Sequence, residues 1–78
     1  MNGRKYKGPQ ILGARSLTTR EEAHRVNLFV MKLGSRDRAA KELGVGLLTL
    51  EQAAREGGSM LTKTRAKLLE ALARTEAA

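Results

Sequence analysis

Residues 35–56 have the sequence SRDRAAKELGVGLLTLEQAARE, which predicts two short helices joined by a tight turn. Ser35 is a suitable N-cap for the first helix, and Gly44 can adopt the left-handed backbone conformation that ends it. The small side chains of Ala39 and Ala40 allow the second helix to pack closely against the first. The apolar positions that we expect to point inward are Leu43, Val45, Leu50 and Ala53.

Helical patterns flank this stretch on both sides. Either Thr18 or Thr19 can begin a preceding helix, because Glu21 and Glu22 stand three residues after them and complete two overlapping capping boxes. Gly34 ends that helix. The second helix of the central stretch follows Gly46 and ends before the glycine pair at 57 and 58, and a final helix is expected over 62–74.

The chain has 78 residues, which allows one domain with a small core worth about 3–5 kcal/mol. No window alternates with a period of two for long enough to indicate a sheet. We therefore predict an all-α fold of four to five helices. Residues 14–78 form this domain, with the motif at 35–56 and the following helix at 62–74, and residues 1–13 form a flexible basic arm.

Several function classes are excluded by composition. The chain has no cysteine and one histidine, so we expect no disulfide, no metal site and no bound cofactor. No nucleophile stands beside an evident base, so we expect no catalytic residues and no enzyme activity. The longest apolar run is Leu28–Met31 and no signal-peptide core is present, so we expect a soluble cytoplasmic protein with no membrane role.

Charge is concentrated near the N-terminus. The chain has 15 Lys and Arg against eight Asp and Glu, and the first twenty residues contain five of these bases and no acid. A basic arm on a nearly neutral helical body is typical of nucleic-acid binders. Two interpretations of the arm bases Arg4, Lys5 and Lys7 remain open: they track a minor groove, or they only attract DNA without specificity.

The central stretch resembles the helix-turn-helix family of DNA-binding transcriptional regulators. Residues 34–45, GSRDRAAKELGV, with Thr49 and Leu50 are similar to the motif of Fis-type proteins, and ELGVG with Thr49 is similar to the turn of Trp-repressor-like domains. Residues 61–68, LTKTRAKL, resemble the helix that follows the motif in lambda-repressor-like and LacI-type domains. The overall layout is similar to that of lambda-repressor and Cro-like domains.

The resemblance implies that the second motif helix lies in the major groove of double-stranded DNA. Its implied base-reading residues are Leu47, Leu48, Glu51, Gln52 and Arg55. Side chains near helix N-termini are interpreted as phosphate contacts, namely Ser35, Arg36, Thr49, Lys63, Thr64 and Arg65. The predicted function is that of a small bacterial or phage repressor, acting as a homodimer on a palindromic operator and with no evident small-molecule effector.

Three alternatives stay open at this level. Leu47 and Leu48 are unusual on a base-reading surface, so they belong either to DNA recognition or to the core or a protein interface. Leucines 68, 69 and 72 either form a dimer contact or close the core of the monomer. The whole domain is then a sequence-specific regulator, a protein-interaction module that keeps the helix-turn-helix shape, or a non-specific architectural DNA-binding protein.

Overall fold

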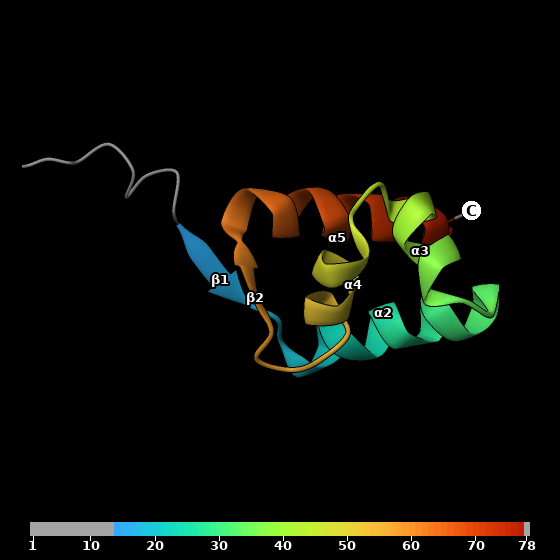
Figure 1. Ribbon diagram of the computed structural model, residues 1–78, viewed down its shortest axis with the longest axis horizontal. Helices are drawn as coiled ribbons and strands as arrows, with labels where there is room; N and C mark the ends of the chain where they lie inside the picture. The colour runs from blue at the N-terminus through green and yellow to red at the C-terminus, as the bar shows by residue number, and fades with distance from the viewer. Residues whose placement is uncertain (1–13, 78) are drawn as a thin grey trace, which may run out of the picture.

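A computed structural model describes residues 14–77 and confirms a small, mainly helical domain. Four helices and a short two-stranded sheet make up this part of the chain (Figure 1). The elements, in order, are β1 (Arg15–Leu17), α2 (Arg20–Leu33), α3 (Arg36–Leu43), α4 (Leu47–Ala53), β2 (Ser59–Leu61) and α5 (Thr62–Ala77). The basic arm predicted at 1–13 lies outside the described residues.

The ends of α2 and α3 form as the local sequence predicts. Of the two possible capping boxes, the one on Thr19 forms: its hydroxyl accepts from the Glu22 backbone N–H at 3.2 Å, and Glu22 Oε1 accepts from the Thr19 N–H at 2.9 Å. Ser35 caps α3 by accepting from the Arg38 N–H. Gly34 and Gly44 end the two helices with φ values of 81° and 73°, in the left-handed region that glycine tolerates.

Thr18, the other candidate cap, has a long-range role instead. Its side chain is buried, and its hydroxyl donates to the backbone oxygens of Gln52, at 3.0 Å, and of Gly58, at 3.2 Å. Its backbone N–H also donates to the Gly58 oxygen, and its own oxygen accepts from the Gly57 N–H. The segment that leads into α2 is thereby bound to the end of α4 and to the loop that follows it. In contrast to the prediction that α4 continues toward the glycine pair, the helix ends at Ala53.

The local sequence does not predict the small two-stranded sheet. β1 pairs antiparallel with β2, with Ser16 opposite Met60, and the Thr62 N–H extends the pairing by donating to the Ala14 oxygen. Each strand has three residues, which is too short to show an alternating pattern. The sheet buries Met60 and brings the start of α5 beside the segment that leads into α2.

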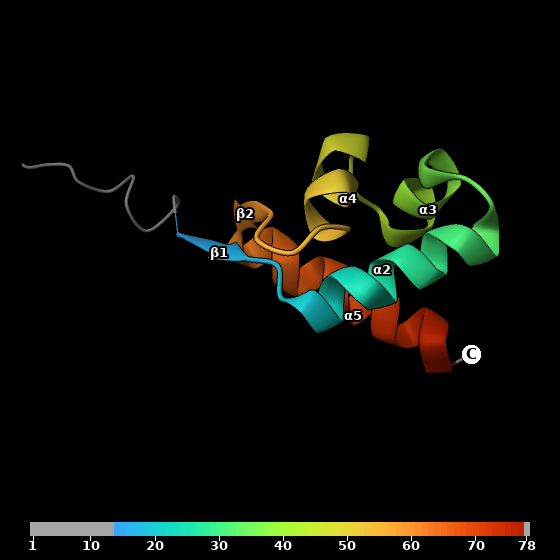
Figure 2. The same cartoon turned by 90° about the horizontal axis from the view of Figure 1, so that it is seen from below.

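The core lies between the two short helices, α3 and α4, and the two long helices, α2 and α5. Figure 2 shows α3 and α4 on one side of these two helices, with α4 rising away from them. Leu68 and Leu72 are almost fully buried, and Leu69 packs against the core. These leucines therefore close the core of the monomer, which was the second of the two alternatives. The buried apolar side chains of the core are Val26, Ala39, Ala40, Leu43, Leu50, Ala53, Met60, Leu68, Ala71 and Leu72, while Val45 is only partly buried.

Two ion pairs join α2 to α5. Arg25 pairs with Glu76, and the Arg65 guanidinium makes two hydrogen bonds with the Glu22 carboxylate. Burial raises the pKa of Glu22, but the hydrogen bonds from Arg65 and from the Thr19 N–H outweigh it, so the pKa lies below its usual value. Arg65 therefore stabilises the fold by joining α5 to α2. Its pairing with Glu22 competes with its predicted role as a phosphate contact.

The ion pair between Glu22 and Arg65 predicts that the folded protein loses stability in acid. Because folding lowers the pKa of Glu22, the stabilisation is fully present above the ordinary Glu pKa of about 4.3 and is lost as the pH falls through the folded value. Urea unfolding followed by circular dichroism between about pH 7 and about pH 3 measures this. We expect Glu22→Gln to lower the free energy of unfolding by about 1.5 kcal/mol at neutral pH. The stability of this variant should also fall less as the pH is lowered. An acid response equal to that of the unmodified protein would contradict the assignment.

Candidate nucleic-acid interface

The exposed side of α4 is the centre of the candidate site. Leu50 and Ala53 are buried on one side of this helix, whereas Leu47 and Leu48 are 43% and 71% exposed. The structure therefore rejects the core alternative for these two leucines and leaves DNA recognition or a protein interface. Leu48 and Gln52 are four residues apart, so they share the side of α4 opposite the core, where Leu48 is exposed and Gln52 is half-buried. Together with the exposed Arg55, which lies in the bend after α4 ends at Ala53, they form the outer row.

A hollow of about 480 Å³ lies along one flank of α4. It brings together Arg36 from the start of α3 and Glu51 from α4, whose side chains form an ion pair with Nη1 of Arg36 3.5 Å from Oε2 of Glu51. Both partners are largely exposed, so the pair contributes little to stability, and Arg36 is able to exchange Glu51 for a phosphate. The hollow is lined by Asn27, Val30, Arg36, Glu51, Gln52, Ala54 and Arg55.

Gln52 contributes to the fold as well as to the candidate surface. Its Oε1 accepts from the Ser59 backbone N–H at 3.1 Å and from the Arg55 guanidinium at 3.3 Å. A bidentate contact with adenine uses both ends of the amide, so Oε1 has to release at least one of the two donors from which it accepts. No sequence pattern indicated this competing contact, because Ser59 lies in β2, a strand too short to be predicted from the sequence. Arg55, in contrast, is exposed and reaches solvent from the end of the row.

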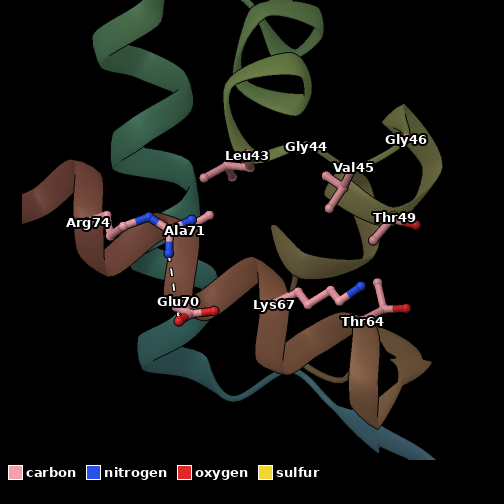
Figure 3. A pocket seen from close by; sticks show the side chains of 10 residues that line it. All are labelled: Leu43, Gly44, Val45, Gly46, Thr49, Thr64, Lys67, Glu70, Ala71 and Arg74. Atoms are coloured by element: carbon pink, nitrogen blue, oxygen red, sulfur yellow. Dashed lines mark ion pairs between the residues drawn. The ribbon is translucent and has the colours of Figure 1, made fainter.

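A second hollow, of about 520 Å³, lies between α4 and α5 (Figure 3). Thr49 and Thr64, both predicted phosphate contacts, face it from the two helices. Lys67 also lines it, although this residue was not among the predicted phosphate contacts. Its spacing of three residues from Thr64 was the available signal, because residues at this spacing share a helix face. The lining consists of Leu43, Gly44, Val45, Gly46, Thr49, Thr64, Lys67, Glu70, Ala71 and Arg74.

The remaining predicted contacts are distributed around these hollows or lie elsewhere. Ser35 is half-buried and its hydroxyl is used as the cap of α3. Lys63 is exposed in the first turn of α5, and Arg65 is bound to Glu22. The arm bases Arg4, Lys5 and Lys7 lie outside the described residues. The structure thus brings Arg36, Glu51, Gln52 and Arg55 together on one flank of α4, and Thr49 and Thr64 on the other.

Two other kinds of site are absent from the described part of the chain. Within residues 14–77, no group of three His, Asp or Glu side chains is arranged to hold a metal ion. No helix in the same range combines the length and apolar character that crossing a bilayer requires. Comparison of the chain with known protein families, curated proteins and solved structures finds no match.

Proposed function

We propose that this protein is a sequence-specific regulator of transcription that inserts α4 into the major groove of double-stranded DNA. The observation that carries the proposal is the outer row, with Leu48 exposed and Gln52 half-buried on a short helix that follows α3 through a tight glycine turn, and with Arg55 exposed just after that helix. A helix presented in this way fits the major groove, where side chains reach the edges of the bases. The cations on both flanks of α4 support the same proposal, because phosphates line both sides of that groove.

In this proposal, the contacts divide into two kinds. Arg55 reads a base edge or the adjoining backbone, and Leu48 contacts thymine methyl groups. Arg36, Lys63 and the basic arm contact phosphates and supply affinity without sequence choice. The protein acts in the cytoplasm as a homodimer, with its two recognition helices about 34 Å apart on a palindromic operator, and represses by excluding polymerase.

The direct test is selection of duplexes from a random-sequence library, followed by binding measurements on the selected and scrambled sites. We expect Arg55→Ala to weaken binding to the selected site by about 1–3 kcal/mol. Lys32→Ala is the matched control, because it removes one positive charge from an exposed position in the last turn of α2. Equal losses for the two variants would show that Arg55 acts only through net charge and would contradict its role in recognition.

A second candidate function is supported by Leu47 and Leu48, since exposed neighbouring leucines are also typical of protein interfaces. A protein-interaction module predicts that Arg55→Ala leaves DNA affinity unchanged and that Leu47→Ser with Leu48→Ser abolishes binding to the protein partner. A non-specific architectural protein predicts equal affinity for selected and scrambled duplexes and a steep dependence on salt.

A further inference from the structure

The hollow between α4 and α5 contains hydrogen-bond donors from both helices. We propose that Thr49, Thr64 and Lys67 form a binding site for a phosphate-type oxyanion, filled by a phosphate of the DNA backbone. This inference rests on the proposed function for the source of the phosphate. It adds Lys67 to the interface and gives Thr49 and Thr64 a shared ligand.

The arrangement of the three side chains fits an oxyanion. Thr64 and Lys67 are three residues apart on α5 and share a face, and Thr49 approaches from α4 across the hollow (Figure 3). The two hydroxyls and the ammonium all donate hydrogen bonds, which phosphate oxygens accept. Both threonines are half-buried, which limits the freedom of their hydroxyls before any ligand binds.

The charge of the hollow also favours an anion. Glu70 is its one acidic lining residue, and its carboxylate pairs with Arg74, with Oε2 3.7 Å from Nη1. This pair leaves the positive charge of Lys67 unbalanced within the lining. Lys67 itself makes no ion pair with any acid of residues 14–77.

The position of the hollow matches the geometry of a helix in the major groove. Thr49 and Glu51 are two residues apart, which places them about 200° apart around α4. The hollow with Lys67 and the hollow with Arg36 therefore lie on opposite flanks, with the exposed Leu48 between them. The major groove is about 12 Å wide and has a sugar–phosphate backbone along each edge, so each flank of an inserted helix faces one backbone.

The test compares Lys67→Ala with Lys32→Ala in the full chain. We expect Lys67→Ala to weaken binding about tenfold on selected and scrambled duplexes alike. It should also lower the slope of log affinity against log salt by about 0.9, the value for one phosphate contact. Thr64→Val, which removes the hydroxyl and keeps the shape of the side chain, should weaken binding without changing the slope. If Lys67→Ala and Lys32→Ala lower affinity and slope equally, the proposal is overturned.

A second measurement separates this site from the proposed function. Inorganic phosphate is added to the ¹⁵N-labelled protein, with sodium chloride at matched ionic strength as the control. Saturable shifts of the Thr49 and Thr64 amide signals that Lys67→Ala abolishes are the expected result. If these shifts occur while no duplex binds, the oxyanion site stands with a soluble ligand and the DNA-binding proposal fails. If neither phosphate nor duplex binds, both fail.

Discussion

Replacing Gly58 with Ala is expected to lower the free energy of unfolding by about 3 kcal/mol or more, which is most of the stability of a domain of this size. A Cβ atom at this position would lie 1.9 Å from the Gln52 backbone oxygen, 2.7 Å from its carbonyl carbon and 2.9 Å from its Cα. All three are main-chain atoms at the end of α4, so no side-chain rotation relieves the overlap. The backbone must separate, and the Thr18 hydrogen bonds to Gln52 and Gly58 are lost with it.

Two other glycines provide graded controls for this prediction. Gly46 has a φ of −74°, and a Cβ atom added to it would have no heavy atom within 4 Å, so Gly46→Ala should cost less than about 1 kcal/mol. Gly57 has equal space but a φ of 84°, so Gly57→Ala should cost about 1–2 kcal/mol through backbone strain alone. Urea unfolding monitored by circular dichroism measures the free energy of unfolding of the three variants and so gives their order. A Gly58→Ala variant as stable as Gly46→Ala would show that the loop does not approach Gln52 closely.

The features that the sequence predicted correctly depend on neighbours within a few residues. The capping box of Thr19 and Glu22 and the glycine end of α3 at Gly44 are determined by local backbone chemistry. The buried faces of the helices follow from helical spacing, whereas the exposure of Leu47 and Leu48, which the sequence left open, is established only by the structure. Most of the helical fold and the candidate recognition helix were therefore predictable.

The features that the sequence did not predict join residues far apart in the chain. Arg65 meets Glu22 across 43 positions, and Arg15 donates from Nε to the Ser59 hydroxyl across 44. Gly58 was predicted only as a helix breaker. The structure shows that a glycine is needed there because the backbone at the end of α4 leaves no room for a Cβ atom. No local pattern records such pairings, because they depend on how the helices pack. For the same reason, the competing contacts of Gln52 became visible only in the structure, whereas the place of Lys67 on the same face as Thr64 follows from their spacing of three residues.

Replacing Arg4, Lys5 and Lys7 together with Ala is expected to weaken DNA binding on the order of 10²-fold at about 0.1 M salt. If each base neutralises one phosphate, the slope of log affinity against log salt falls by about 2.7. The preferred sequence should not change, because the outer row of Leu48, Gln52 and Arg55 remains intact. Salt titrations on a selected duplex, combined with a repeat of the library selection, measure both quantities. A new preferred sequence would show that the arm takes part in recognition.

The variant Arg4→Lys distinguishes the two interpretations of the arm, because it keeps the charge and changes only the shape of the cationic group. If the arm acts through charge alone, this variant should bind like the unmodified protein at every salt concentration, since the number of released counterions is the same. If Arg4 enters a minor groove, its planar guanidinium is not replaced by an ammonium, and the loss should be greatest for sites flanked by narrow A·T tracts. If Arg4→Lys keeps the full affinity, sequence choice belongs to α4 alone. If it loses affinity only at A·T-flanked sites, both α4 and the arm take part in sequence choice.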